Sequence, residues 1–287
     1  MNIIKPKNLK SGDNIAIIAP SGILDREKFL LGIENFKKLG FRPVYNERIF
    51  EKKRYLAGCD DEKVAEIENY FKNPEIQGII CARGGYGTLR LINKIDYKIV
   101  KDNPKYFGGY SDITILQLMF LKHAGLVTYT SPMIQPDFGD DEVCEFTVNK
   151  FLSPPKQIEC KIIQSGKAEG ILWGGNLASI SSLCGVDFLP DKDFIFFTED
   201  ICEPSYKIDR MLQQLLNIDK FRKHIKGIVF GEFKGCDKDD FLKDLENEFA
   251  LTLNIPAFEN LNITHSKTKL TLPIGVDAKI CDGQLFL

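Results

Sequence analysis

The chain has 287 residues, 44% of them hydrophobic and 27% charged, which is an ordinary composition for a folded protein and a length sufficient for two domains. Its 38 Lys and Arg residues nearly balance its 40 Asp and Glu residues, which excludes a surface built for nucleic acid or anionic lipid, because both partners require a positive excess. No apolar run approaches the ~20 residues of a membrane span, and the start of the chain lacks the apolar core of a signal peptide, so no membrane partner is expected.

The first 125 residues alternate short apolar runs with helical patterns. Strands are predicted at residues 14–19, 41–46, 77–81 and 105–108, and helices at residues 25–39, 60–71, 89–92 and 113–121. This alternation predicts an open parallel sheet with helices on both faces. Ligands of such sheets bind beyond the carboxyl ends of the strands. Two turns are predicted there, at residues 83–87 and 109–112.

The stretch 151–170 changes in character, with Pro154-Pro155 and only a short apolar alternation, and indicates an interdomain connection. The patterns beyond it predict strands and one clear helix, at 171–176, 194–199, 205–216 (the helix), 225–233 and several places within 270–287. We therefore predict an α/β fold in two parts. An N-terminal α/β domain (1–150) has the open parallel sheet with flanking helices, and a smaller mixed α/β, strand-rich C-terminal domain covers 171–287.

Ser111 is the first candidate for chemistry. It stands between a strand-like run and a helix-like run, and a sharp strand-to-helix turn exposes a side chain and leaves backbone N–H groups free. A nucleophile needs the first property and an oxyanion the second. Local rules alone favour a helix cap formed by Ser111 or Asp112, so both interpretations stay open.

The chain has three histidines that could serve Ser111 as a base. His123 ends the helix that Ser111 precedes, roughly 18 Å away at ~1.5 Å rise per residue, and cannot reach. His224 belongs to the last turn of a predicted helix, where a cation suits the helix dipole, and a structural role is favoured. His265 lies in a polar loop, a common place for functional histidines, and stays a candidate.

A serine–histidine pair usually needs a carboxylate that fixes the imidazole tautomer. Glu199 is the best candidate because it ends an apolar strand, where a side chain can enter a cleft. Asp200 and Glu203 compete with it. The alternative for Glu199 is a solvated acid at a strand end.

The turn Arg83-Gly84-Gly85-Tyr86-Gly87 has several interpretations. Its N–H groups could bind a phosphate or an oxyanion, or the segment could be a plain tight turn. It matches neither G-x-G-x-x-G nor a P-loop. Arg83 could bind a carboxylate through two parallel hydrogen bonds or form a surface ion pair. The phosphate interpretation corresponds to a non-catalytic nucleotide or sugar-phosphate binding protein.

The eight cysteines are scattered and form no C-x-x-C pair. Zinc ligation and a disulfide framework are therefore both poor interpretations, and free thiols are typical of a reducing cytoplasm. We predict a cytoplasmic protein.

Taken together, these motifs resemble those of the LD-carboxypeptidase family of serine peptidases, over almost the whole chain. The resemblance depends on the order and joint presence of motifs at residues 17–22, 82–87 with 90–91, 109–114, 174–177, 199–200 ahead of 206–212, and 265 ahead of 272–275.

The resemblance implies hydrolysis of an LD-peptide bond near a free carboxyl terminus, typically the release of D-Ala from a murein tetrapeptide during cell-wall recycling. It implies a triad of Ser111, His265 and Glu199 that acts through an acyl-enzyme. It also implies oxyanion donors at the backbone N–H groups of Gly85 and Asp112, no metal or cofactor, and a homodimer.

Two features leave the substrate open. Residues 129–132 (Tyr-Thr-Ser-Pro) replace the His-Gly-Pro or Tyr-Gly-Pro expected there. Residues 264–273 look closer to the branch that contains the microcin C7 immunity peptidase, which cleaves a peptidyl-nucleotide type of substrate. Trp173, the only tryptophan, could stack on a ligand base, although a core role is favoured.

Overall fold

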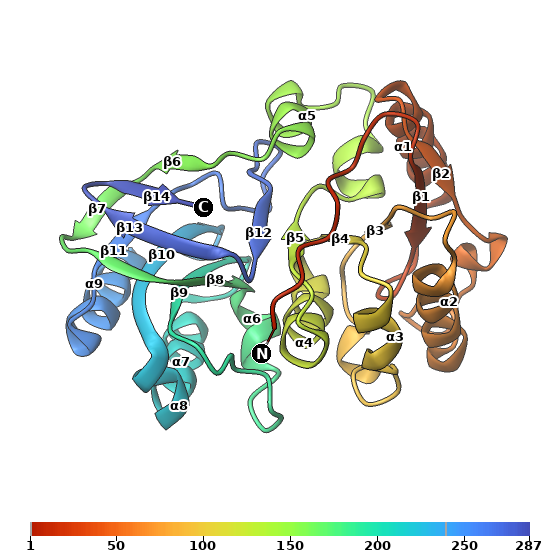
Figure 1. The fold of residues 1–287 in the computed structure, drawn as a ribbon. Coiled ribbons are helices and arrows are strands. Elements are labelled where there is room, and N and C mark those ends of the chain that lie inside the picture. The colour runs from red at the N-terminus through yellow and green to blue at the C-terminus, as the bar shows by residue number, and fades with distance from the viewer. Residues whose placement is uncertain (1, 239) are drawn as a thin grey trace.

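The computed structural model describes residues 2–238 and 240–287. Two mixed sheets organise the chain, one in each half, and Figure 1 shows them side by side with strand β12 near the boundary. The α/β class and the two-part organisation that the sequence predicts are thus confirmed.

The first sheet has the strand order β12-β5-β4-β3-β1-β2. Its strands are β1 (Asn14–Ile18), β2 (Arg42–Val44), β3 (Gly78–Cys81), β4 (Tyr106–Gly109), β5 (Thr128–Thr130) and β12 (Leu272–Ile274). The first five are parallel, as predicted. The sixth comes from the second half and pairs antiparallel with β5, with Leu272 opposite Thr130. The sheet is therefore mixed, and its edge is completed by the distant end of the chain.

The helices of the first half are α1 (Arg26–Lys38), α2 (Asp60–Lys72), α3 (Tyr97–Asp102), α4 (Thr114–Ala124) and α5 (Glu145–Leu152). Helices α1, α2 and α4 lie close to the predicted ranges, whereas the sequence patterns do not predict α3 and α5. The helix predicted at 89–92 is instead a short 3-10 turn, Thr88–Arg90. Helix α1 shows the local cause: Asp25 caps it by accepting the N–H of Lys28, and Phe29, Ile33 and Phe36 form its buried face. Most of α4 is buried, and its apolar residues are shared between the hydrophobic cluster of the second half and a cluster of the first half. This central position explains why most of its residues are apolar.

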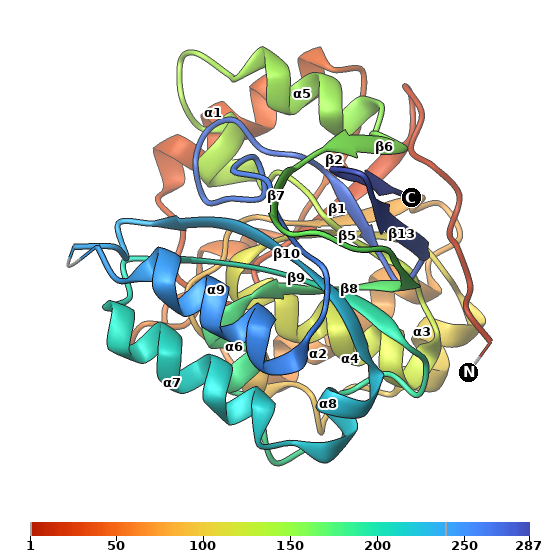
Figure 2. The ribbon, with the colours of Figure 1, turned by 90° about the vertical axis from the view of Figure 1, so that its left-hand side faces the viewer.

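The second sheet has the order β6-β14-β13-β8-β9-β10-β11-β7. Its strands are β6 (Gln157–Glu159), β7 (Lys161–Gln164), β8 (Ala168–Asn176), β9 (Phe194–Ile201), β10 (Ile225–Lys234), β11 (Ala257–Glu259), β13 (Asp277–Cys281) and β14 (Gln284–Phe286). Helices α6 (Leu177–Ser181), α7 (Ser205–Leu216), α8 (Asp219–His224) and α9 (Leu242–Leu253) accompany it. Figure 2 shows all four on the same side of the sheet.

The predicted connection at 151–170 is more structured than a linker. It contains the end of α5, strands β6 and β7, and the start of β8. Strands β6 and β7 form the two opposite edges of the second sheet. The apolar signal was weak because edge strands expose much of their surface, and polar residues suit such edges.

Candidate active site

Ser111 occupies a strained turn at the carboxyl end of β4. It follows Gly109 and Tyr110 and opens a short 3-10 helix, Ser111–Ile113, that leads directly into α4. Its φ is +64°, a left-handed conformation that is uncommon for a residue with a side chain. A Cβ on Gly109 would lie 3.0 Å from Ile113, which explains the glycine. The backbone is thus bent sharply at the residue that the sequence marks as a nucleophile.

Asp112 ties this turn to two other loops. Its carboxylate accepts hydrogen bonds from Ser21 Oγ at 2.6 Å and from Thr88 N at 3.0 Å, and its carbonyl accepts one from Thr88 Oγ1 at 2.6 Å. Burial raises the pKa of Asp112, although these hydrogen bonds oppose the shift. No side-chain cap bond is formed at the start of the helix that opens with Ser111. The capping alternative is therefore wrong for both residues.

Ser21 and Thr88 lie within or beside the sequence motifs, but their residue types alone predict no role for either. Ser21 is 91 positions from Asp112 along the chain. In the structure Ser21 is completely buried, beside Gly22. No pattern in the sequence pairs these residues, because the contact depends on how β1, β3 and β4 align in the sheet.

The turn after β3 lies directly against Ser111. A Cβ on Gly84 would lie 2.8 Å from the Cβ of Ser111, so only glycine permits this approach. Gly85 has a φ of +119°, and the carbonyl of Gly84 accepts a hydrogen bond from Gly22 at 3.3 Å. The loops at residues 20–22, 84–88 and 110–112 thus form one structure around the serine.

Glu199 and His265 form a hydrogen-bonded pair in the second half. Glu199 Oε2 lies 2.5 Å from His265 Nδ1, and the two side chains are 6% and 10% exposed. Glu199 lies within β9, so it is a buried residue and not a solvated acid at a strand end. A carboxylate can only accept, so Nδ1 carries a proton, and in the neutral imidazole Nε2 then keeps its lone pair. Nε2 is buried and has no hydrogen-bond partner among the described residues.

Contacts between the halves bring this pair next to the serine turn. The ring of Tyr110, the residue before Ser111, lies 5.1 Å from the His265 ring at an interplanar angle of 79°. Ser179 Oγ in α6 donates to the Ser111 carbonyl at 3.3 Å. The N–H of Asn176 donates to Thr114 Oγ1 in α4. No hydrogen bond joins Ser111 to Nε2 of His265.

Asp200, a competitor of Glu199, has a different set of partners. It is 2% exposed, and its carboxylate accepts hydrogen bonds from Asn176 Nδ2, Ala178 N and Ile201 N at 2.8–2.9 Å. These bonds fix the junction of β8 and α6 and do not involve His265. The remaining competitor, Glu203, forms an ion pair with Lys207 at 3.1 Å.

Asp200 makes stability depend on pH. Burial raises its pKa from 3.8 to about 6, so the native protein binds this proton more tightly than the unfolded chain does. The free energy of unfolding should therefore fall as pH rises from about 4 to about 6, by about 3 kcal/mol from this group. Urea unfolding across this range should show a smaller decline for Asp200→Asn than for the wild type. Equal slopes would contradict the assignment.

The two proposed binding residues differ in their surroundings. Trp173 is 0% exposed and packs against Phe188, Phe194 and Phe196. It belongs to the core, which is the role that the sequence favours, and the alternative of stacking on a ligand base is wrong. Arg83 is partly buried beside the turn, where its guanidinium donates to the carbonyls of Ile23 at 2.8 Å and Gly84 at 3.2 Å. No ion pair to Arg83 occurs within residues 2–238 and 240–287.

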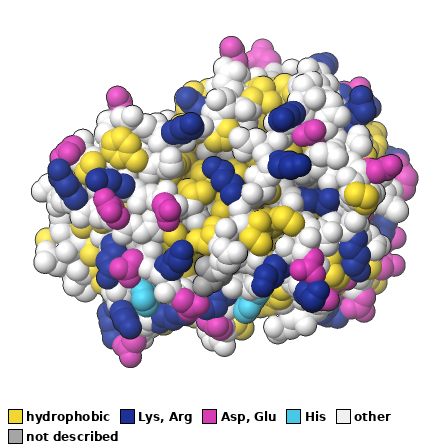
Figure 3. Space-filling view, in the orientation of Figure 1, with side chains coloured by type: hydrophobic (Ala, Val, Ile, Leu, Met, Phe, Trp, Pro, Cys, Tyr) yellow, Lys and Arg dark blue, Asp and Glu magenta, His cyan; other side chains and the backbone are white. Residues whose placement is uncertain are grey.

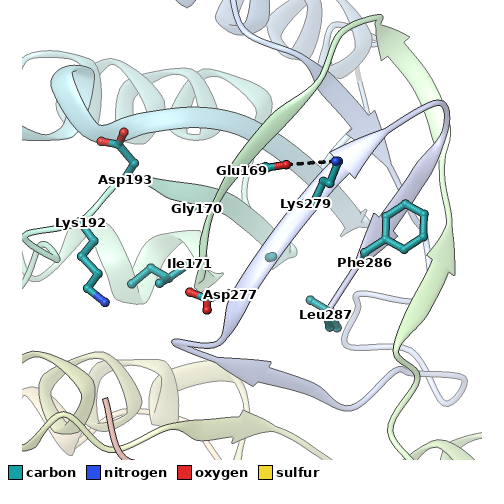
Figure 4. Close-up of a pocket in the computed structure, with 10 residues that line it drawn as sticks. Glu169, Gly170, Ile171, Lys192, Asp193, Asp277, Lys279, Phe286 and Leu287 are labelled. Atoms are coloured by element: carbon teal, nitrogen blue, oxygen red, sulfur yellow. Dashed lines mark ion pairs between the residues drawn. The ribbon is translucent and has the colours of Figure 1, made fainter. Parts of the chain in front are cut away.

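A pocket lies far from Ser111, Glu199 and His265. This pocket lies along β8 and β13 and has a volume of about 480 Å³. Glu169 and Lys279, which form an ion pair at 3.0 Å, lie beside it (Figure 4). It is lined by Gly170, at the start of β8, whereas Asn176, at the end of β8, lies beside Glu199. Six residues of strand separate the two places by about 20 Å. The pocket therefore belongs to neither the serine turn nor the Glu199–His265 pair.

Charges of both signs are mixed on the surface. Figure 3 shows Lys and Arg side chains among Asp and Glu side chains, with hydrophobic side chains reaching the surface in the middle of this face. None of the helices described is both long and apolar enough to cross a membrane. In the described part of the chain, no group of three or more His, Cys, Asp or Glu side chains could hold a metal ion, and all eight cysteines are free.

Comparisons with known proteins identify the family of the chain. The model of an LD-carboxypeptidase N-terminal domain matches residues 15–131, and that of an LD-carboxypeptidase C-terminal domain matches residues 169–280. The chain is 34% identical to a probable murein peptide carboxypeptidase of Bacillus subtilis (strain 168), over 96% of this chain and 90% of that protein.

Two solved structures share the fold over nearly the whole chain. A muramoyltetrapeptide carboxypeptidase from Oxalobacter formigenes is 32% identical, with a TM-score of 0.87 over 95% of this chain and 97% of that one. An MccF-like protein from Bacillus anthracis is 27% identical, with a TM-score of 0.88 over 98% of both chains. The family models, the Bacillus subtilis relative and these folds together show that the chain belongs to the LD-carboxypeptidase family of serine-type peptide hydrolases.

Proposed function

We propose that this protein is a cytoplasmic serine carboxypeptidase that hydrolyses the LD-peptide bond of a murein tetrapeptide and releases the terminal D-Ala. The observation that carries the proposal is the buried Glu199–His265 pair. His265 Nε2 has no hydrogen-bond partner among the described residues, and the His265 ring contacts Tyr110, the residue before Ser111. The likeness to carboxypeptidases that act on murein peptides supports this substrate class. A homodimer is part of the proposal.

In the proposed reaction, Ser111 Oγ attacks the scissile carbonyl while His265 Nε2 takes its proton. Glu199 holds the imidazole in the productive tautomer and offsets the charge that develops on it. When the tetrahedral intermediate collapses, His265 gives the proton to the amine of D-Ala, which leaves. Water then attacks the ester of Ser111, with His265 again acting as the base, and frees the shortened peptide and the serine.

The backbone N–H groups of Gly85 and Asp112 are the proposed oxyanion donors. Asp112 lies in the first turn of a helix, where N–H groups have no acceptor within the helix. Gly85 follows Gly84, which touches Ser111. Donors of this kind each contribute roughly 3–4 kcal/mol to the stabilisation of the transition state.

Gly85→Ala should lower kcat about 100-fold. The φ of +119° is unfavourable for alanine, and its Cβ would lie 3.4 Å from Gly22, so the turn should shift and misplace the N–H group. Steady-state kinetics of D-Ala release measure the effect. Gly185→Ala is the matched control, since Gly185 has a φ of +115° and open space around it. If both variants lose equal activity, the loss at Gly85 reflects backbone strain and not the oxyanion site.

Arg83 is the proposed ligand of the substrate carboxylate. Its Nε and Nη1 are used by two carbonyls, whereas a guanidinium has five N–H donors, so donors remain for a carboxylate. Positive charge at this place also suits an enzyme that cleaves next to a free carboxyl terminus. The guanidinium has no carboxylate partner in the described part of the chain.

The function is tested by presenting the wild-type enzyme with three substrates under identical conditions. These are a murein tetrapeptide, the same peptide with its carboxyl terminus amidated, and a peptidyl-adenylate analogue. The proposal expects rapid release of D-Ala from the free acid and at least about 100-fold slower cleavage of the amide. Equal rates for acid and amide would overturn the role of Arg83, and no release of D-Ala would overturn the murein assignment.

A second candidate is an amidase for peptidyl-nucleotides, which the similarity to the microcin C7 self-immunity protein MccF of Escherichia coli favours. It uses the same serine, histidine and glutamate, so faster cleavage of the peptidyl-adenylate analogue than of the tetrapeptide would select it. Membership of a peptide hydrolase family removes the support for a non-catalytic nucleotide or sugar-phosphate binding protein. Light scattering in solution tests the homodimer.

A further inference from the structure

Lys269 forms a buried ion pair across the boundary between the two halves. It lies in the loop that carries His265, and its ammonium pairs with Asp137 in the π-helical turn Ile134–Phe138 of the first half. Both side chains are 4% exposed. Paired burial of this kind adds little net stability compared with apolar packing, but it strongly disfavours any arrangement that separates the charges.

The same ammonium contacts the residue next to the proposed nucleophile. Lys269 Nζ lies 4.0 Å from the centroid of the Tyr110 ring, within the range of a cation–π interaction. The Tyr110 ring in turn contacts the His265 ring. Tyr110 therefore touches both Lys269 and His265, while its own backbone continues directly into Ser111.

Two hydrogen bonds also hold the backbone of the His265 loop against the first half. Thr147 in α5, a buried residue, donates its hydroxyl to the carbonyl of Lys267 and accepts the N–H of Lys269 at 3.0 Å. The loop is thus fixed to the first half both through its backbone and through the Lys269 side chain.

The Lys269 ammonium is buried and has little open space beside it. The cavity that Lys269 lines together with Tyr110 and Glu199 has a volume of about 10 Å³, room for about one water molecule. Any influence of Lys269 on the reaction must therefore pass through the residues that it touches.

On the basis of the proposed function, we propose that Lys269 is a positioning residue, which through Asp137 and Tyr110 sets the place of His265 relative to Ser111. Each half of the chain supplies one part of the triad, and the ion pair lies at the point where the Ser111 turn meets the His265 loop. Loss of the pair should leave substrate binding intact and disturb the alignment needed for proton transfer.

The test is the double variant Lys269→Met/Asp137→Asn, which removes the pair without leaving a lone buried charge. We expect kcat to fall about 100-fold, because small misplacements of reacting groups have effects of that size, with KM changed less than about threefold. The labelling rate of Ser111 by a fluorophosphonate should fall in parallel. Tyr110→Leu, which removes the ring but no charge, should reproduce this loss, and combining it with the double variant should add little.

Lys122→Met is the matched control. Lys122 is 8% exposed and forms another ion pair between the halves, with Asp191, at the end of α4 away from Ser111. Its activity should stay unchanged. A double variant with wild-type kcat and labelling rate would overturn the positioning role, whereas full activity of Ser111→Ala would overturn the proposed function itself. If the double variant fails to fold, a wild-type kcat for Tyr110→Leu would likewise overturn the positioning role.

Discussion

Ser111→Ala is expected to lower kcat by about five orders of magnitude and to leave KM nearly unchanged. The Ser111 hydroxyl is the group that forms the acyl-enzyme in the proposed reaction, and alanine offers no oxygen in its place. In serine peptidases the triad acts as a unit, so Ser111→Ala/His265→Ala should be no slower than Ser111→Ala alone. The rate of D-Ala release from a murein tetrapeptide, measured in single-turnover experiments, is compared between the single and the double variant.

Ser181→Ala is a suitable control because Ser181 is bonded to Gln214 on the surface of the second half, and it should keep wild-type kinetics. Circular dichroism should show the same fold for all of these variants. Wild-type turnover by Ser111→Ala would refute the nucleophile, and a double variant much slower than either single variant would refute cooperation between Ser111 and His265.

Glu199→Gln should lower kcat by about four orders of magnitude at neutral pH. The amide can donate to Nδ1, and the imidazole then carries its proton on Nε2, so it can no longer accept the proton of Ser111. The substitution keeps the size of the side chain in its buried place, so the loss should appear in kcat and not in stability. Steady-state kinetics and a urea melt of the same preparation separate the two effects.

Glu203→Gln is the matched control, because it makes the same chemical change in a nearby glutamate that forms an ion pair with Lys207. This variant is expected to keep full activity. A loss smaller than about tenfold for Glu199→Gln would mean that the imidazole does not depend on this carboxylate. The Glu199 assignment would then be withdrawn, while the Ser111 assignment would stand.

Much of the fold follows from local patterns. The helix at Ser205–Leu216 has the predicted bounds, and strands β1, β3 and β4 lie within one or two residues of them. These elements have strong apolar signals because they are buried. The sequence patterns do not predict strand β5, because its three residues are too few to show a period. The edge strands β6 and β7 are not predicted either, because they are short and largely exposed.

The candidate site was predictable only in part for the same reason. Order and spacing of motifs pointed to Ser111, Glu199 and His265, but local rules favoured a cap for Ser111. Only the structure shows that Asp112 bonds to Ser21 and Thr88, and that the only tryptophan is completely buried. Contacts such as that between Lys269 and Asp137, 132 positions apart, are set by the pairing of distant segments, and no window of sequence displays them.

The pairing of β12 with β5 has a consequence for biosynthesis. Residues 272–274 complete the edge of a sheet whose other strands are all synthesised before residue 131. A nascent chain that ends before β12 presents β5 as an open edge, which is a template for unwanted strand addition. In such a chain the end of the His265 loop is also not anchored, because Gly275 and Val276, directly after β12, form backbone hydrogen bonds with Leu172 in the other sheet. The turn of Ser111 and the loop of His265 are therefore brought together only after residues 272–276 have been synthesised and have joined the two sheets.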